Sequence, residues 1–420
     1  MSSAATPRAV VIGAGVVGLA CAARLTMAGR AVTVLDPQPP GMGCSYGNAG
    51  CFSLASFVPI GMPGLWRKVP GWLMDRDGPL SIPPSYAARI APWLWWLLRA
   101  SSLARVERTC DEMHDFLGVA LDRWRPLAAW AGVSELVQRN GWAVVYESEA
   151  AYQADALGWR LRRERGVEIH VLQGAEIREL EPALGPHFTH MAYLPEQGQC
   201  PNPLRLSQAL AATLERHGAR FERRAAVGFD FRQGRVRAVR TEAGAVEADE
   251  VVVAAGAHSA ELAAKLGSRI PLETERGYHA MVEGAESARL LTRPVMSGEG
   301  KFFATPMEDG MRFAGSVELG GLRAPPDYRR ADILLRKGRA MLPALPQGKV
   351  SRWMGMRPSL PDTKPAIGRA PGVANAFFAF GHGHTGLTGA AATGGIVADL
   401  AAGREPDLDI RPFDPARFGR

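Results

Sequence analysis

The sequence predicts an α/β protein that combines a Rossmann-like dinucleotide-binding domain with a second domain built on a mixed or antiparallel sheet. The chain has 420 residues, enough for one large core or for two domains. A strand, a glycine-rich turn, a helix and a second strand follow one another between residues 9 and 36. Apolar segments typical of strands recur much later, at 142–146, 278–282 and 311–317.

The N-terminal unit has the parts of a dinucleotide-binding fingerprint in the right order. Ala9–Ile12 is a short β-branched run, as a buried parallel strand requires, and Leu19–Ala28 is rich in Ala and Leu and suits a helix. Gly29 ends that helix, and Ala31–Leu35 forms a second strand that leads to Asp36. This order predicts a dinucleotide site.

Three glycines of this unit have separate tasks. Gly13 permits the tight turn, Gly15 lets a pyrophosphate approach the backbone, and Gly18 lets the helix pack against the strand. The helix N-terminus supplies N–H groups and a positive dipole end for the phosphates. Asp36 can accept hydrogen bonds from the ribose hydroxyls. The fingerprint alone does not distinguish FAD from NAD.

The composition is that of a globular protein in water, with 47% hydrophobic and 22% charged residues. No run of about 18 apolar residues suggests a transmembrane helix. The start, Met1–Arg8, lacks the apolar core of a signal peptide, and Ala9–Ile12 is too short to supply one. These features predict a cytoplasmic protein.

The net charge is +7, from 49 Lys and Arg against 42 Asp and Glu, and the sequence pI is near 9.4. The basic residues are scattered. The short arginine cluster at Arg160–Arg165 is interrupted by Glu164 and followed by Glu168. A solvated helix face explains this pattern better than a nucleic-acid patch, so no nucleic acid is expected as a partner.

The cysteines and histidines indicate neither a disulfide framework nor a metal site. The five cysteines are widely spaced, odd in number and without a CxxC pair. His382 and His384 are two residues apart, and no carboxylate or cysteine lies near them in sequence. Metal chemistry is therefore not expected.

Three later segments carry a second pattern. The first is a small-residue polar loop from Gly43 to Gly50, and the second is a buried strand at 250–253 that ends in small residues. The third begins as Met356-Arg-Pro-Ser-Leu-Pro-Asp and continues to Gly368. After a strand at 376–380, a glycine-rich loop from Gly381 opens a helix that runs through Leu400.

These segments resemble the FAD-binding elements of the D-amino-acid oxidase superfamily, which includes glycine oxidase and sarcosine oxidase, and they agree best with the bacterial D-amino-acid dehydrogenase branch. The resemblance extends over the whole chain and implies an FAD domain of the glutathione-reductase and D-amino-acid-oxidase type. It also implies a strand at 223–227 whose last backbone unit faces the adenine. The expected FAD-binding residues are Gly13, Gly15, Val16, Val17, Gly18, Asp36, Ser45, Asn48, Ala49, Gly50, Val227, Ala255, Gly256, Gly381, Gly383, His384, Thr385, Gly386, Leu387 and Thr388.

The FAD is expected to be bound non-covalently. Monomeric sarcosine oxidase attaches its flavin through a cysteine shortly before the Pro-Asp of the third segment, whereas this chain reads Gly355-Met-Arg-Pro there. The expected FAD domain is discontinuous, and the two inserts form a substrate domain. The predicted ranges are 1–56, 171–267 and 350–420 for the FAD domain and 57–170 and 268–349 for the substrate domain.

Three residues are candidates for substrate contact, because an amino-acid carboxylate is best fixed by an arginine. Arg357 matches the carboxylate-binding arginine of glycine oxidase and its relatives; the alternative is an ion pair with Asp362. Tyr278 resembles a pocket tyrosine whose hydroxyl donates to the same carboxylate; the alternative is a core tyrosine. His384 is placed to contact the substrate, to hold the flavin edge or, as a neutral base, to take the ammonium proton. His382 is expected to pack within its loop.

The leading hypothesis is an FAD-dependent dehydrogenase of small D-amino or D-imino acids that passes electrons to a quinone or another respiratory acceptor. An oxygen-using oxidase of the glycine or sarcosine type is the alternative, because oxygen access depends on packing. An FAD-carrying subunit of a multi-subunit dehydrogenase, such as one for hydroxyproline, is an alternative of another class. An NAD-dependent dehydrogenase would leave the C-terminal glycine segments unexplained. The oligomeric state is left open.

A tryptophan-rich part of the first insert has two interpretations. Trp66 and Trp72, and the segment 90–99 with its three tryptophans, place aromatic rings beside leucine and arginine. Such a segment suits either an interfacial anchor on the cytoplasmic face of the inner membrane or a helix that buries its tryptophans in the core.

Overall fold

The N-terminal residues form the predicted unit of strand, turn, helix and strand. The structure is a computed structural model and describes residues 6–419. β1 (Arg8–Ile12) leads into α1 (Val16–Met27), and β2 (Ala31–Leu35) lies parallel to β1. The helix begins before the predicted Leu19, because Gly15 already has the extended conformation of an N-cap, with ψ at 170°.

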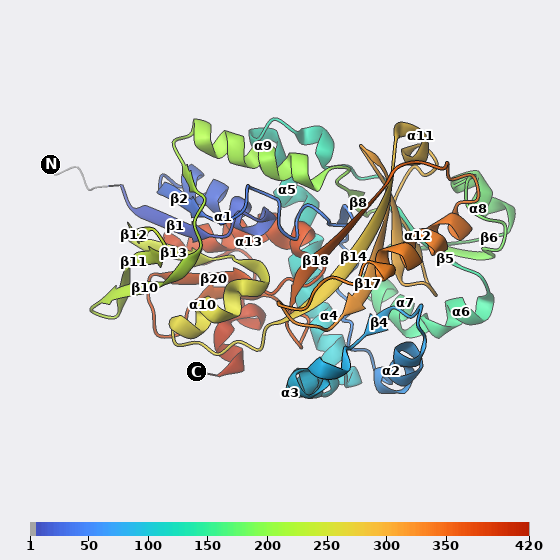
Figure 1. The fold of residues 1–420 in the computed structure, drawn as a ribbon, viewed down its shortest axis with the longest axis horizontal. Coiled ribbons are helices and arrows are strands. Elements are labelled where there is room, and N and C mark those ends of the chain that lie inside the picture. The colour runs from blue at the N-terminus through green and yellow to red at the C-terminus, as the bar shows by residue number, and fades with distance from the viewer. Residues whose placement is uncertain (1–5, 420) are drawn as a thin grey trace.

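β1 and β2 belong to a six-stranded sheet that is parallel except at one edge (Figure 1). The strand order is β19 (Ala366–Arg369), β20 (Ala376–Phe380), β13 (Glu250–Val253), β1, β2 and β9 (Arg220–Glu222). β19 pairs antiparallel with β20, and the other neighbours are parallel. The strands predicted at 250–253 and 376–380 are confirmed.

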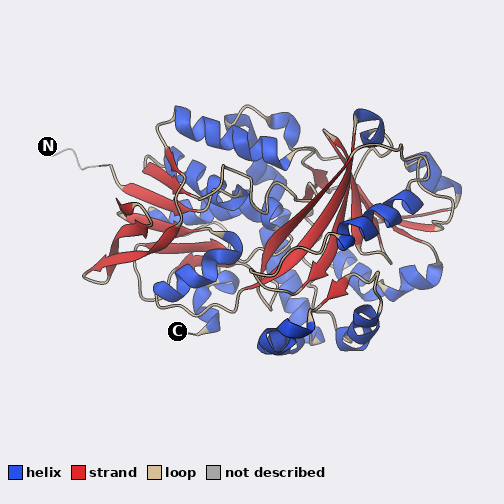
Figure 2. Cartoon of the chain, in the orientation of Figure 1, coloured by secondary structure: helices blue, strands red, loops and turns tan. Residues whose placement is uncertain are grey.

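Alternate side chains of β1 enter two separate cores, as the pleat of a strand buried on both faces requires. Ala9 and Val11 pack on the face that is covered by α1, α5, α9 and α13. Val10 and Ile12 pack on the face covered by α10 and a small three-stranded sheet (Figure 2). These elements are α5 (Ala120–Trp130), α9 (Pro203–Arg216), α13 (Gly386–Ala401), α10 (Ser259–Lys265), β10 (Ala226–Arg232), β11 (Arg235–Thr241) and β12 (Gly244–Glu247).

The second large sheet is mixed and has nine strands. Its order is β18 (Val350–Ser359), β14 (Glu273–Glu283), β17 (Gly310–Glu318), β16 (Phe302–Met307), β15 (Val295–Ser297), β5 (Trp142–Tyr146), β7 (His190–Leu194) and β6 (His170–Gln173), with β4 (Leu80–Ser81) beside β17. The strands predicted at 142–146, 278–282 and 311–317 are confirmed within β5, β14 and β17. A two-stranded pair of β3 (Cys51–Phe52) and β8 (Gly198–Gln199) lies apart from both large sheets.

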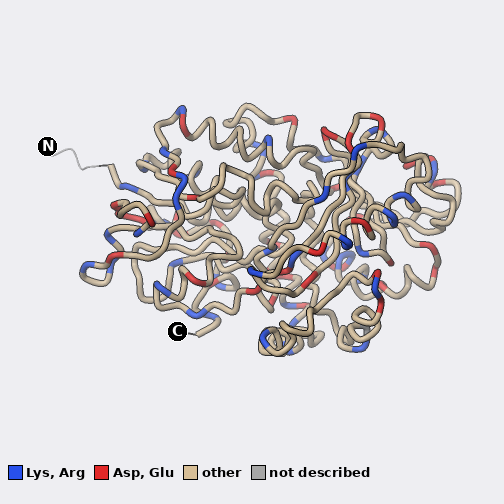
Figure 3. The backbone as a smooth tube through the Cα atoms, viewed as in Figure 1, with Lys and Arg blue, Asp and Glu red and all other residues tan. Residues whose placement is uncertain are grey.

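Most of the remaining helices lie around the nine-stranded sheet (Figure 1). They are α2 (Leu65–Met74), α3 (Pro84–Ala100), α4 (Leu103–Gly118), α6 (Glu149–Ala154), α7 (Ala156–Arg163), α8 (Ala175–Leu180), α11 (Ala285–Ala288) and α12 (Arg329–Met341). Basic and acidic residues are interspersed along the described chain (Figure 3).

Two expectations differ from the observed strands. The strand expected at 223–227 is wrong, because β9 ends at Glu222 and β10 begins at Ala226 in a different sheet. The expected domain ranges group β7, β18 and most of β6 with the FAD domain, whereas all three pair within the nine-stranded sheet. Sheet membership depends on which backbones hydrogen-bond, and the residue pattern of a single strand does not reveal its partner.

The contact between α1 and α13 depends on a glycine that permits close packing. A Cβ on Gly394 of α13 would lie 2.6 Å from the carbonyl oxygen of Ala20 in α1, which is too close for two non-bonded heavy atoms. The next residue, Gly395, has no such neighbour within 4 Å. The two helices therefore pack backbone to backbone at Gly394 and not at Gly395.

This pair of neighbouring glycines gives a stability test. Gly394→Ala should lower the free energy of unfolding by about 1–3 kcal/mol, because the added methyl group forces α1 and α13 apart. Gly395→Ala is the matched control and should be neutral or stabilise by up to about 1 kcal/mol, as expected for alanine in a helix. Thermal unfolding midpoints of the two variants measure the difference. Equal midpoints would contradict the close contact.

Candidate active site

A cavity of about 1330 Å³ lies between the two large sheets. One wall comes from the carboxyl ends of β1, β2 and β13 and from the start of α1. The opposite wall comes from β14, β17 and β18, and residues of α2 and α3 add an apolar side. The loop between β20 and α13 also reaches the cavity. Ligands of doubly wound sheets bind at the same place, outside the carboxyl ends of the strands.

The glycine turn brings α1 close to the end of β13. Gly13 has a φ of +114°, and a Cβ there would lie 2.3 Å from the carbonyl oxygen of Ala254. A Cβ on Gly18 would lie 1.9 Å from the carbonyl oxygen of Gly13. Neither position tolerates a side chain. The start of α1 and the chain after β13 therefore meet at one end of the cavity.

The N-terminus of α1 is partly satisfied by side chains. The backbone N–H of Val16 donates to Oγ of Ser45 at 2.9 Å. Asp36 accepts from the N–H of Ala14 at 2.7 Å through Oδ2 and from the N–H of Gln38 at 2.8 Å through Oδ1. Asp36 thus fixes the turn as well as lining the cavity, and its oxygens have lone pairs left for further donors.

Arg357 lies in the cavity wall on β18, with its guanidinium over the backbone of β14. A Cβ on Gly277 would lie 2.2 Å from Cζ of Arg357, so the absence of a side chain at Gly277 makes room for the charge. Nη1 donates to the carbonyl of Ser316 at 3.0 Å and Nη2 to that of Gly315 at 3.4 Å. The alternative pairing with Asp362 does not form, because Asp362 pairs with Arg417 at 2.8 Å.

Tyr278 lines the cavity, but its hydroxyl is engaged within the protein. Its side chain is 1% exposed, and its hydroxyl donates to Glu318 while accepting from the N–H of Asp327 at 3.0 Å. Burial and Glu318 raise the pKa of Tyr278 to about 12. The residue therefore fits the alternative, a strand tyrosine in the core next to the buried Arg276.

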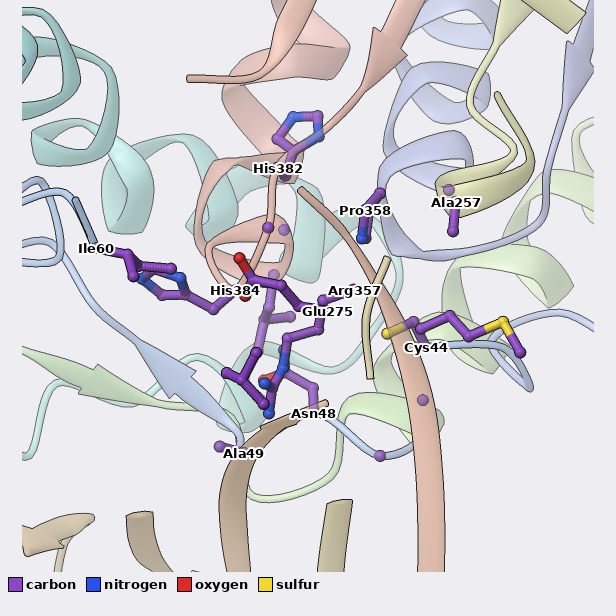
Figure 4. Close-up of a pocket in the computed structure, with 18 of the residues that line it drawn as sticks. Cys44, Asn48, Ala49, Ile60, Ala257, Glu275, Arg357, Pro358, His382 and His384 are labelled. Atoms are coloured by element: carbon purple, nitrogen blue, oxygen red, sulfur yellow. The ribbon is translucent and has the colours of Figure 1, made fainter. Parts of the chain in front are cut away.

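His384 points into the cavity near Arg357 (Figure 4). The residue is exposed, and desolvation together with the charge of Arg357 lowers the pKa of His384 to about 4. The ring is neutral at pH 7 and is a weak base. His382 packs in its loop as expected, with Nε2 2.9 Å from Oγ1 of Thr393, and burial lowers the pKa of His382 to about 3.

Most of the residues expected to bind FAD line the cavity. They are Gly13, Gly15, Val16, Val17, Asp36, Ser45, Asn48, Ala49, Val227, Ala255, Gly256, Gly383, His384, Gly386 and Leu387. Val227 reaches the cavity from β10 rather than from the expected strand, and its carbonyl accepts from Nζ of Lys265 at 2.6 Å.

Five expected residues are not among those that line this cavity: Gly18, Gly50, Gly381, Thr385 and Thr388. The two threonine hydroxyls are held within the protein. Oγ1 of Thr385 donates to the carbonyl of His382 at 2.9 Å, and Oγ1 of Thr388 accepts from the N–H of Ser53 at 3.1 Å. Within residues 6–419, no group of three or more His, Cys, Asp or Glu side chains is arranged to hold a metal ion.

Comparison with known proteins decides the family. The family model described as FAD dependent oxidoreductase matches residues 8–400. The chain belongs to this family. It is therefore an FAD-dependent oxidoreductase, as the resemblance of its glycine-rich segments predicts.

Full-length relatives carry two related names. A protein named D-amino-acid oxidase from Bradyrhizobium diazoefficiens is 42% identical over 415 residues, covering 97% of this chain and 98% of the relative. A protein named D-amino acid dehydrogenase from Cereibacter sphaeroides is 32% identical over 421 residues, with 98% and 95% covered. The prediction of an FAD-dependent enzyme of this superfamily is thus confirmed.

Solved structures show the same fold at low identity. Glycine oxidase from Geobacillus kaustophilus superposes with a TM-score of 0.76 at 22% identity and covers 98% of this chain and 99% of its own. L-proline dehydrogenase from P. horikoshii gives a TM-score of 0.74 at 20% identity, with 98% of both chains covered. The predicted fold class, an FAD-binding Rossmann-like domain with a mixed-sheet second domain, is confirmed.

The cavity of this FAD-dependent oxidoreductase fits its cofactor. Its volume exceeds the roughly 300–1,000 Å³ of typical small-molecule sites, which leaves space for a large cofactor together with a small second molecule. The side-chain-free turn at Gly13 and the start of α1 provide the backbone approach and the N–H groups that a pyrophosphate needs. The residues present are therefore suited to FAD.

The sequence interpretation missed two features of the site. Glu275 lines the cavity although it is only 4% exposed; its neighbours in the strand are the polar Thr274 and Arg276, so no local pattern distinguishes it. The insert also contributes an apolar wall of Ile60, Trp93 and Leu97. No local motif marks such a wall, because it forms only when α3 folds over the sheet.

Replacing Gly277 by alanine should displace the guanidinium of Arg357, since the new Cβ would overlap it. We expect the affinity of the FAD-loaded protein for a carboxylate such as propionate to fall about 10-fold, or about 1.4 kcal/mol. Changes in the flavin absorbance spectrum measure the binding. Gly118→Ala is the control, because nothing lies within 4 Å of a Cβ at that position. An unchanged affinity in the Gly277 variant would remove Arg357 from the carboxylate site.

Proposed function

We propose that this protein oxidises the Cα–N bond of small D-amino or D-imino acids and passes the electrons to a quinone-type or other respiratory acceptor. The observation that carries the proposal is the position of Arg357, whose guanidinium lies on the cavity wall opposite the glycine turn. A planar cation with free N–H donors is suited to holding a carboxylate in a fixed orientation. The names of the full-length relatives support the substrate class.

When bound, FAD supplies an acceptor for the hydride that leaves Cα. The residues that would hold it are Asp36 and Val227 toward the adenosine, Gly15–Val17 at the pyrophosphate, and Ser45, Asn48, Ala49 and the loop 383–387 toward the ring, without a covalent bond. Arg357 fixes the substrate carboxylate and so orients Cα. His384, neutral at pH 7, can accept a hydrogen bond from the substrate amine. The apolar residues of α2 and α3 keep water away from the reacting carbon.

The choice of acceptor has support on both sides. Proteins named D-amino acid dehydrogenase match almost the whole chain at 30–32% identity, and an apolar wall beside the cavity suits a lipophilic acceptor. The 42% identical relative is named D-amino-acid oxidase, which favours the second candidate, an enzyme that reduces oxygen.

Anaerobic bleaching of the flavin absorbance tests the proposal. D-amino or D-imino acids should bleach the flavin quickly, L-isomers should not, and slow recovery in air would favour the dehydrogenase over the oxidase. In Arg357→Met the bleaching rate at low substrate concentration should fall about 10- to 100-fold, as expected when charged hydrogen bonds worth about 1.5–3 kcal/mol are lost.

Arg352→Met serves as the control for this variant, because Arg352 lies on the same strand, is exposed and pairs with Asp332 outside the cavity. Its bleaching rate should equal that of the wild type. If FAD-loaded wild-type protein is bleached by no amino or imino acid of either configuration, the substrate assignment is wrong although the fold and cofactor stand.

We further propose that α2 and α3 make peripheral contact with an anionic membrane. Among the described residues, no helix is long and apolar enough to cross a bilayer. α3 buries Ile90, Trp93 and Leu97 against the protein but leaves other apolar residues outside. The exposed apolar residues of the two helices are Trp66, Leu73, Met74, Trp95, Trp96 and Leu98.

Arginines accompany these exposed rings. Cζ of Arg67 lies 5.1 Å from the ring centroid of Trp66, and Cζ of Arg99 lies 4.6 Å from that of Trp95. Aromatic rings beside cationic groups are typical of helices that lie in a membrane interface. Both helices lie on one side of the molecule (Figure 1), so they can meet a flat surface together.

Sedimentation with vesicles that contain anionic phospholipid tests this contact. We expect a fraction of the protein to pellet with the vesicles and to be released by high salt or detergent. Replacing Trp66, Trp95 and Trp96 by serine should abolish the pelleting. Phe231→Ser, which removes an exposed ring on β10 away from both helices (Figure 1), should leave it unchanged. If both variants pellet to the same extent, the proposed membrane contact is wrong.

A further inference from the structure

Glu275 is a buried acid that faces the same cavity as Arg357. It lies on β14 directly opposite Arg357 on β18 in the antiparallel register. Residues opposite each other in such a pair project from the same face of the sheet. Figure 4 shows Glu275, Arg357 and His384 converging on one part of the cavity. A negative and a positive side chain thus stand next to each other on the cavity wall.

The two charges do not neutralise each other by direct contact. Among residues 6–419, no carboxylate lies within 4.0 Å of the Arg357 guanidinium, which extends over Gly277 to the carbonyls of Gly315 and Ser316. Burial raises the pKa of Glu275, and the nearby charge of Arg357 and a hydrogen bond from Ser359 oppose this rise. A buried carboxylate is costly unless a cation or hydrogen-bond donors compensate it.

The other cationic groups of the cavity wall are held by partners other than Glu275. Lys301 pairs with Asp155 at 2.9 Å, Lys265 donates to the carbonyl of Val227, and Arg162 donates to the carbonyls of Ala55 and Gly158. His384 is neutral at pH 7. Within the described chain, the charge of Arg357 and a hydrogen bond from Ser359 favour the ionised form of Glu275, and the ammonium group of a ligand would add a second positive charge.

We propose that Glu275 and Arg357 together bind a zwitterion, with Arg357 holding the carboxylate and Glu275 the ammonium group of the amino acid. An α-amino acid carries its two charges on neighbouring groups of one small molecule, and Glu275 and Arg357 are cross-strand neighbours that both line the cavity, so one ligand can contact both side chains. Glu275 would then determine specificity for acids with a free primary or secondary amine and discriminate against N-acyl amino acids and 2-hydroxy acids. This inference rests on the proposed oxidation of amino acids.

A purely structural role for Glu275 makes a different prediction. If the acid only balanced the charge of Arg357, its removal would change the binding of every carboxylate in the same direction. If Glu275 binds the ammonium group, its removal should weaken the binding of amino acids. It should strengthen the binding of carboxylates without an amine, because Glu275 no longer repels the ligand carboxylate. D-alanine and propionate are a suitable pair, since they differ only in the amino group.

The experiment compares these two ligands in the FAD-loaded wild type and Glu275→Gln. Propionate binding is measured from the spectrum of the oxidised flavin, and D-alanine binding from the concentration dependence of anaerobic bleaching. We expect Glu275→Gln to raise the D-alanine dissociation constant at least about 10-fold and to lower that of propionate several-fold. Glu275→Asp should restore part of the preference. Glu283→Gln, at the far end of the same strand, is the control.

The outcomes separate the two proposals. If wild-type protein binds propionate and D-alanine but Glu275→Gln shifts both constants in the same direction, the zwitterion proposal is wrong and the proposed function stands. If wild type is bleached by no amino acid, the proposed function itself fails. Should Glu275→Gln lose its flavin, the wild type still decides: D-alanine and N-methyl-D-alanine must bind more tightly than propionate, and N-acetyl-D-alanine must not.

Discussion

The contact between the Gly13 turn and the end of β13 is the constraint on which the rest of the site depends. With a Cβ position 2.3 Å from the carbonyl oxygen of Ala254, the turn can be made only by glycine, and its φ of +114° requires the same residue. This approach sets α1 directly above the parallel strands. It also brings the chain after β13 and the N–H groups of α1 to one end of the cavity, so the cofactor end is fixed by backbone rather than by side chains.

The opposite wall of the cavity, formed by β14 and β18, also depends on glycines. β14 and β18 pair over ten residues without a shift in register, and Gly277 of β14 faces Gly355 of β18. Because neither has a side chain, the guanidinium of Arg357 can lie flat on the strands, while the adjacent Trp353 fills the space over Gly355. A long, regular strand pair is a stiff support, and stiffness matters where a substrate carbon must be oriented against a cofactor.

Local features of this chain could be predicted from sequence, and pairings between distant segments could not. β2, β5 and β20 match their expected residues, because a short β-branched or apolar run bounded by turn residues has few other conformations. The hydroxyl partner of Tyr278 is Glu318, forty residues away, and no local pattern indicates it. The same holds for Glu275, whose importance appears only when the register of β14 and β18 places it opposite Arg357. Val227 lines the cavity as expected, but it belongs to β10 and not to a strand at 223–227. Resemblance to a family indicates that a residue lies near the cofactor, but not which strand carries it.

One of the two carbonyls that hold the Arg357 guanidinium belongs to a residue with a strained backbone. This arrangement leaves the positive charge of Arg357 available to a ligand. Ser316 has a φ of +60° although it is not glycine, and it lies where the pairing of β14 with β17 is interrupted between Arg276 and Tyr278. The irregularity turns the carbonyl of Ser316 toward Nη1 of Arg357, while its hydroxyl accepts from Arg330 at 3.0 Å. Such a conformation costs on the order of 1–3 kcal/mol and persists only where the surroundings enforce it. A carbonyl dipole holds the guanidinium in position without cancelling its charge, as a carboxylate at the same place would do. The strain at Ser316 therefore preserves the electrostatic attraction that a substrate carboxylate needs.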